Sequence, residues 1–200
     1  MSNVPQFLVK RNHHWKVRSM LDKEFGEMFV AEIISISGGL LAGALLAAYL
    51  QQILLIPGLF ILLPGFLEMR GNISGALAAR IGTALDLHRI PSRPDHNKVV
   101  GPNIFATFVE VLVVAMSLAV VAYVVTYIFF GTATLLIFPI AFIAALLSNV
   151  IEAPLTAYTT FWLFKKGHDP NNIMGPYVTT TGDIISVVSL LAAIFIVTWI

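Results

Sequence analysis

Five long stretches of apolar residues, separated by short polar segments, dominate the chain. A helix needs about 20 mostly apolar residues to cross a hydrocarbon core of about 30 Å, and each stretch is long enough. The breaks contain glycine, proline or clusters of polar residues, which end helices. The pattern therefore predicts an all-α membrane protein with five transmembrane helices per chain. These helices are expected at residues 29–54, 57–84, 103–130, 133–164 and 173–199.

The polar segment ahead of the first apolar stretch has a different character. Its first 28 residues contain no uninterrupted apolar core with a cleavage site, so they do not resemble a signal peptide. Residues 17–28 have the amphipathic pattern of a helix that lies on a membrane surface. The expected organisation is a cytoplasmic segment with an amphipathic helix over residues 1–28, followed by a five-helix transmembrane domain over residues 29–200.

Composition supports the membrane assignment. Hydrophobic residues make up 58% of the 200 residues, charged residues make up 12%, and the mean hydropathy is +0.85. These values lie outside the range of soluble domains, and the length allows one helix bundle without a separate soluble domain of ordinary size. The chain has no cysteine, which excludes disulfide bonds and thiolate metal sites. The lipid bilayer is therefore an expected partner.

Basic residues lie on one side only of the predicted spans. They precede the first span and occupy the connections between spans two and three and between spans four and five, whereas the two opposite connections contain no lysine or arginine. The positive-inside rule then predicts an integral protein of the cell membrane with a cytoplasmic N-terminus and an external C-terminus. The basic cluster before span one is topogenic, and no nucleic-acid partner is expected. The basic residues concerned are Lys10, Arg11, Lys16, Arg18, Lys23, Arg89, Arg93, Lys98, Lys165 and Lys166.

The number of predicted spans is odd, and no internal repeat is visible in the sequence. Two copies in one membrane then associate most simply as a parallel homodimer whose two-fold axis runs along the membrane normal. A pathway at the two-fold axis would be lined by both copies.

Several polar residues fall near the middle of the predicted spans. Asp183 is ten residues beyond Ile173, or about 15 Å along a helix, and Glu68 is about 16 Å beyond Pro57. Ionisable groups at this depth usually face a bundle interior or a water-filled path, so they are candidates for a functional site.

Each of these polar residues also has a purely structural interpretation. Asp183 could hydrogen bond across a helix contact, and Glu68 could form an internal ion pair with the nearby Arg70. Asn149 and Glu152 lie on one face of span four, where a structural interhelical network and a transport role are both open.

Spans two and five have the composition of helices that line a cavity. The sequence PGFLEMRGNISGALAAR in span two contains Pro64, Gly71 and Gly75, which favour a broken helix with free carbonyl oxygens. In span five, Thr179, Asp183 and Ser186 share one helix face. Oxygen ligands of this kind suit a hard divalent cation, and Mg²⁺ in particular is often held through its waters by one or two carboxylates.

Two stretches resemble a known family. They are PGFLEMRGNISGALAARIGTAL in span two and HDPNNIMGPYVTTTGD at the start of span five. Together they resemble the transmembrane domain of the magnesium transporter E family and its eukaryotic relatives, solute carrier family 41. The order of the two motifs and the five spans also fit, so the resemblance covers about residues 25–200.

The resemblance implies a divalent cation pathway, chiefly for Mg²⁺, along the axis of a parallel dimer. The family's pore aspartate corresponds to Asp183, its neighbouring carbonyl to Thr179, and its glycine-asparagine pair to Gly71 and Asn72. Glu68 joins these four as a candidate metal ligand because of its depth. The chain has no large N-terminal regulatory region like the bacterial members. It carries one copy of the domain where the eukaryotic relatives carry two, which predicts a homodimer.

The predicted function is transport of Mg²⁺ across the membrane through a dimeric pore, with residues 29–200 as the cation-transport domain and an intramembrane aspartate binding the hydrated ion. Mn²⁺ and Co²⁺ are alternative substrates. The alternative functions are a Na⁺- or H⁺-coupled exchanger, in which Glu68 or Glu152 takes the coupling ion, and a non-transporting membrane assembly protein. An enzyme is not expected, because no nucleophile and base pairing or phosphate loop is visible.

Overall fold

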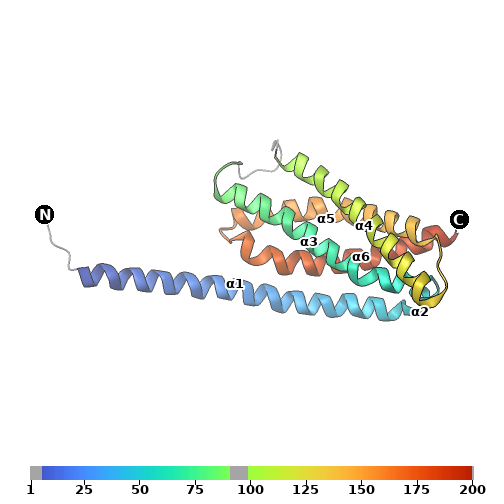
Figure 1. Ribbon diagram of the computed structural model, residues 1–200. Helices are drawn as coiled ribbons and strands as arrows, with labels where there is room; N and C mark the ends of the chain where they lie inside the picture. The colour runs from blue at the N-terminus through green and yellow to red at the C-terminus, as the bar shows by residue number, and fades with distance from the viewer. Residues whose placement is uncertain (1–5, 91–98, 200) are drawn as a thin grey trace.

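The computed structural model describes residues 6–90 and 99–199 of the chain, and in these ranges it consists mainly of six α-helices (Figure 1). Four helical stretches are long and apolar enough to cross a membrane, and they lie in α1, α4, α5 and α6. This confirms the all-α membrane class. The helices are α1 (Gln6–Ala48), α2 (Leu50–Leu54), α3 (Leu59–Asp86), α4 (Val100–Phe130), α5 (Ile137–Lys165) and α6 (Pro170–Trp199).

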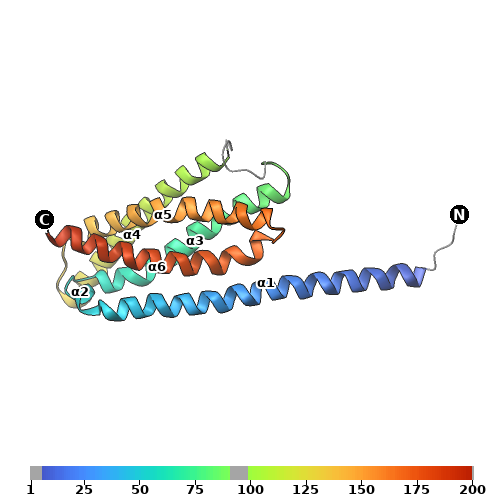
Figure 2. The same ribbon diagram turned by 180° about the vertical axis from the view of Figure 1, so that it is seen from behind.

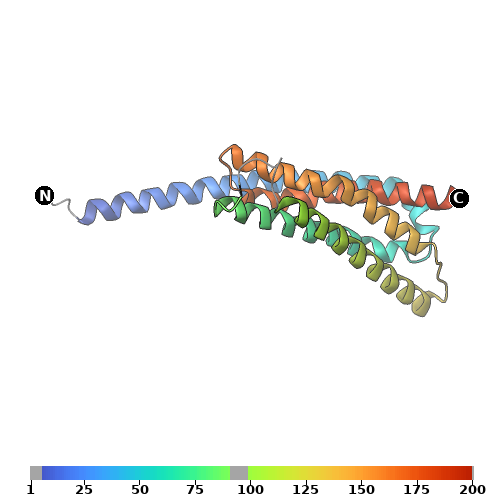
Figure 3. The same ribbon diagram turned by 90° about the horizontal axis from the view of Figure 1, so that it is seen from above.

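The second predicted span, residues 57–84, corresponds to α3, which is long enough to cross a membrane but less apolar than the other four long helices. It has 28 residues, or about 42 Å of helix. Glu68, Arg70 and Asn72 lower its apolar character. It packs against α4, α5 and α6 (Figure 3), while a stripe along it that includes Glu68, Asn72 and Ala76 stays exposed. Arg70 therefore faces other helices, whereas Glu68 and Asn72 lie on the exposed side.

The expected break in span two is absent, and that prediction is wrong. Helix α3 runs without interruption from Leu59 to Asp86 with Pro64 inside it. A proline removes one backbone donor, which a long and well-packed helix tolerates, especially where its neighbours hold it. Gly71 and Gly75 remain helical and lie at the contact with α6, so they do not form a loop of free carbonyls.

The N-terminal segment is part of one long helix. Helix α1 extends over 43 residues without a break between residues 28 and 29, whereas the sequence predicted a separate amphipathic helix over residues 17–28. Its first half projects beyond the bundle, and its second half packs along α6 (Figures 1 and 2). Residues 1–5 of the predicted cytoplasmic segment lie outside the described residues, and nothing tests its place on a membrane surface.

Turns with glycine explain two of the predicted breaks. Gly58, which precedes α3, has φ +88°, and Gly131, which follows α4, has φ +66°. This left-handed region favours glycine. A Cβ atom at Gly58 would also lie 2.7 Å from Oγ1 of Thr126, so the turn packs directly against α4.

Small residues bring α4 and α5 close together. Three alanines of α4 and three of α5 are almost fully buried and belong to the largest apolar cluster, which α3 and α6 complete. Small side chains permit the close approach on which helix packing in membranes depends. These alanines are Ala115, Ala119, Ala122, Ala141, Ala144 and Ala145.

Candidate functional site

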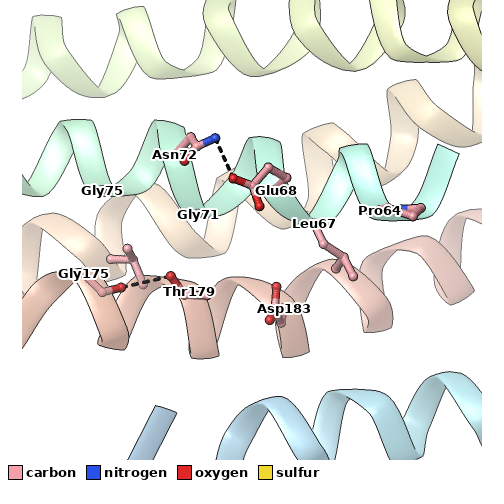
Figure 4. Close-up of a pocket in the computed structure, with 10 residues that line it drawn as sticks. Pro64, Leu67, Glu68, Gly71, Asn72, Gly75, Gly175, Thr179 and Asp183 are labelled. Atoms are coloured by element: carbon pink, nitrogen blue, oxygen red, sulfur yellow. Dashed lines mark hydrogen bonds between the residues drawn. The ribbon is translucent and has the colours of Figure 1, made fainter. Parts of the chain in front are cut away.

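A groove of about 420 Å³ lies between α3 and α6. Its lining includes all five residues that the sequence marked as candidate cation ligands, so the structure brings them together (Figure 4). Helix α3 supplies Glu68, Gly71 and Asn72, and α6 supplies Thr179 and Asp183.

Glycines of α3 lie at the contact with α6 along this groove. A Cβ atom at Gly71 would lie 3.6 Å from Oγ1 of Thr179, and one at Gly75 would lie 3.8 Å from Cγ2 of Val178. Further along, a Cβ atom at Gly82 would lie 3.2 Å from Oδ1 of Asn171. Residue numbers therefore rise along α3 as they fall along α6, which makes the pair antiparallel.

The antiparallel register places the two groove carboxylates at one level. Thr179 lies across from Gly71, and Asn171 lies across from Gly82. Extending this register toward the N-terminus of α3 places Asp183 across from Glu68. Figure 4 shows the Glu68 side chain running along α3 toward Asn72, above Asp183, whose side chain is directed toward α3. Nδ2 of Asn72 donates a hydrogen bond of 3.2 Å to Oε1 of Glu68, which fixes that carboxylate at the groove surface.

Neither groove carboxylate is neutralised by a basic side chain. Within the described residues, the ion pairs join Glu27 to Lys23 and to His168, and Arg70 to Glu152. Asp183 is half-buried, whereas Glu68 is exposed to the groove. Two carboxylates at one level without basic partners attract cations, and a divalent cation more than a monovalent one.

Behind the groove lies a second set of polar residues that the sequence did not connect. Nη2 of Arg70 forms an ion pair with Oε2 of Glu152, and Nη1 of Arg70 donates a hydrogen bond of 3.1 Å to Oδ1 of Asn149. Arg70, Glu152 and Asn149 are almost completely inaccessible to solvent. The structural interpretation of Asn149 and Glu152 as an interhelical network is therefore confirmed in geometry.

The sequence alternative of an ion pair between Glu68 and Arg70 is wrong. Residues two apart on a helix are separated by about 200° around its axis, so these side chains point to opposite sides of α3. Glu68 faces the groove, and Arg70 faces α5. The only sequence signal for the true pairing was the presence of opposite charges at similar depth in two different spans.

Ser186 shares the face of Thr179 and Asp183 on the continuous α6, as the sequence predicts, but it is fully buried and does not line the groove. It lies three residues beyond Asp183, where neighbouring side chains cover this face. The groove face of α6 is therefore limited to Gly175, Val178, Thr179 and Asp183.

A single copy of the chain offers few groups for direct metal coordination. Within the described residues of one protomer, no group of three or more His, Asp or Glu side chains could hold a metal ion. The groove instead offers carboxylates, an amide and a hydroxyl, which suit a cation that keeps its water shell.

These features define a helical membrane protein with an acidic groove between two of its helices. The sequence pattern of the divalent cation transporter family (MgtE) matches residues 63–193, which include most of α3 and α6. The chain belongs to this family. The resemblance predicted from the two motifs is thereby confirmed, and so is the exclusion of an enzyme, since the family consists of transporters.

Curated relatives show a more distant similarity. The chain is 29% identical over 139 residues to solute carrier family 41 member 2 of Gallus gallus, which covers 66% of this chain and 24% of the relative. It is 28% identical over 148 residues to member 3 of Rattus norvegicus, covering 68% of this chain and 31% of the relative. The matched region spans about a quarter to a third of these relatives. No solved structure matches the chain significantly.

Proposed function

We propose that the chain moves Mg²⁺ across the cell membrane along a pathway formed by the α3–α6 grooves of two copies, with Asp183 and Glu68 attracting the hydrated ion. The observation that carries this proposal is that two carboxylates without basic partners lie across from each other in one groove. Family membership supports a divalent cation as the substrate. Mn²⁺ and Co²⁺ are the competing substrates.

The size of the groove agrees with a hydrated ion. Mg²⁺ prefers octahedral coordination and gives up its waters reluctantly. Six waters at about 30 Å³ each occupy about 180 Å³, which fits within the groove of about 420 Å³. The carboxylates of Glu68 and Asp183 would accept hydrogen bonds from those waters, while Thr179 and Asn72 add further oxygen atoms.

The exposure of the groove supports a homodimer. Glu68 and Asn72 are exposed in the single chain, and they lie near the middle of α3, which is flanked by helices long enough to span a membrane. A carboxylate facing hydrocarbon costs several kcal/mol, so a second copy or water must cover it. A parallel partner related by a two-fold axis supplies an identical acidic groove, which doubles the carboxylates around the ion.

The proposed orientation has the N-terminus in the cytoplasm and the C-terminus outside, with residues 1–28 cytoplasmic and residues 29–200 as the transport domain. Lys165 and Lys166 lie at the end of α5 and carry this orientation together with Arg89. Arg93 and Lys98, which support the same orientation in the sequence, lie outside the described residues.

Transport itself is tested with purified protein in proteoliposomes that contain a Mg²⁺-sensitive dye. At a fixed inside-negative potential of about 100 mV, a divalent ion gains about 4.6 kcal/mol on entry. We expect uptake that is independent of a Na⁺ gradient and absent from protein-free vesicles. Uptake that follows the Na⁺ gradient would favour the exchanger, and no uptake of any divalent cation would leave only the assembly role.

The dimer is tested with single cysteines, since the natural chain has none. Ala76 lies on the exposed side of α3 near the groove, and Val120 lies on the exposed side of α4. We expect Ala76→Cys to give a cross-linked dimer with a short bifunctional thiol reagent in membranes. Val120→Cys is the matched control and should stay monomeric. Cross-linking only at Val120 would place the interface on α4 and contradict the proposed axis.

A further inference from the structure

The buried ion pair of Arg70 and Glu152 lies directly behind the groove. Both side chains have 0% exposure. In sequence, Arg70 immediately precedes Gly71 on α3, and Gly71 lines the groove. The pair therefore lies in the same layer of the membrane as Glu68 and Asp183, but on the other side of α3.

Glu152 also presses against α6 next to Asp183. A Cβ atom at Gly182 would lie 2.8 Å from Oε1 of Glu152, so an alanine at this position would require the Glu152 carboxylate to shift. One carboxylate oxygen of Glu152 thus binds Arg70 on α3, and the other packs on the backbone of α6. Glu152 of α5 thus contacts both α3 and α6 on the side away from the groove.

This arrangement is poorly suited to maximum stability. Nε of Arg70, Oε1 of Glu152, Oγ of Ser74 and Nδ2 of Asn149 are buried without hydrogen-bond partners. A buried ion pair with unsatisfied atoms generally stabilises a fold no more than apolar side chains of the same volume. Directional polar contacts do, however, favour one separation and register of the elements they join, which apolar contacts define less sharply.

The same contacts argue against a second cation site at Glu152. One oxygen is engaged by a guanidinium, and the other lies against the α6 backbone. An added cation would face the positive charge of Arg70 at close range in a region of low dielectric. The pair is therefore better suited to holding helices than to binding a coupling ion.

We infer that the Arg70–Glu152 pair is a positioning element that fixes the separation of α3 and α6 and thereby determines which divalent cation the groove accepts. This inference rests on the proposed function, in which the groove is the cation path. Mg²⁺ keeps a rigid octahedral shell, whereas Ca²⁺ accepts six to eight oxygen ligands at variable distances. A groove of fixed width discriminates between these ions, and a groove of variable width loses that discrimination.

The test is the ratio of Ca²⁺ to Mg²⁺ uptake by the full chain in proteoliposomes. The double variant Arg70→Met with Glu152→Leu removes both charges together and keeps comparable volume. We expect it to fold and to take up Mg²⁺, with a Ca²⁺ to Mg²⁺ ratio at least about fivefold higher than that of the natural chain. A folded double variant with an unchanged ratio would overturn the inference while leaving the proposed function intact, because Mg²⁺ uptake would persist.

Two milder variants keep the inference testable if the double variant does not fold. Arg70→Lys retains the charge but cannot reach both Glu152 and Asn149 in the same geometry, and Gly182→Ala adds one methyl group against Oε1 of Glu152. We expect both to raise the ratio at least about twofold. Gly43→Ala on α1 is the matched control, because a Cβ atom there meets nothing within 4 Å, and it should leave the ratio unchanged. Unchanged ratios in Arg70→Lys and Gly182→Ala would refute the positioning role.

Discussion

Replacing Asp183 with asparagine is expected to reduce Mg²⁺ uptake by proteoliposomes at least about 30-fold. The substitution preserves the shape of the side chain and removes one negative charge from each groove. Two unit charges at 4 Å attract by about 1 kcal/mol in water and about 4 kcal/mol at an effective dielectric constant of 20, and a divalent ion doubles this energy. Even the lower limit of about 2 kcal/mol corresponds to about a 30-fold loss of occupancy.

The measurement is the initial rate of dye-reported uptake at fixed potential over a range of Mg²⁺ concentrations. A loss of electrostatic attraction predicts that the half-saturating concentration rises along with the fall in rate. Glu110→Gln is the matched control, because Glu110 is a carboxylate on the exposed side of α4, away from the groove. Equal uptake by the natural chain and by Asp183→Asn would make Asp183 a packing residue and remove the basis of the proposed ion site.

Glu68 gives this groove a second carboxylate per chain beside Asp183. Its carboxylate lies across from Asp183 and is held by Asn72 one turn further along α3. A dimer would thus present four carboxylates in one layer, with the two Arg70–Glu152 pairs, which carry no net charge, behind them. In the proposed dimer this acidic layer would attract the ion, and the neutral pairs would separate the layer from the rest of the bundle.

The sequence predicts the spans and the depth of the groove residues because both depend on local pattern. Long apolar stretches and the glycine and proline breaks locate the helices to within a few residues, apart from the N-terminal extension of α1. A rise of 1.5 Å per residue then gives the depth of Glu68 and Asp183. Because α3 and α6 are continuous helices, Glu68 and Asp183 lie at defined positions along them.

Properties that depend on distant packing could not be predicted in the same way. The composition around Pro64 and Gly71 suggested a broken helix, but contacts with α4, α5 and α6 hold α3 continuous. Likewise, the sequence neighbour of Arg70 with opposite charge is Glu68, whereas its actual partner Glu152 lies 82 residues away on α5. Helix phase places Glu68 and Arg70 on opposite sides of α3, and only the packing of the bundle shows which helix each side faces.

Replacing Glu152 alone with leucine is expected to destabilise the protein by about 3–5 kcal/mol. This variant leaves the guanidinium of Arg70 buried with only Asn149 as a partner, and an uncompensated buried charge is far less favourable than an intact pair. Adding Arg70→Met to the same chain removes the uncompensated charge, so the double variant should recover most of the loss. The measurement is the free energy of unfolding of the detergent-solubilised protein for the natural chain, both single variants and the double variant.

This set of four proteins forms a double-mutant cycle, which isolates the coupling between the two side chains. A large coupling energy with a stable double variant would mean that the pair selects one helix arrangement without being needed for folding. If Glu152→Leu were as stable as the natural chain, the Arg70 charge must reach water or the groove carboxylates instead. The Arg70–Glu152 layer would then no longer separate the groove from the bundle interior. Arg70 would act on the cation directly by repulsion and not through the spacing of α3 and α6.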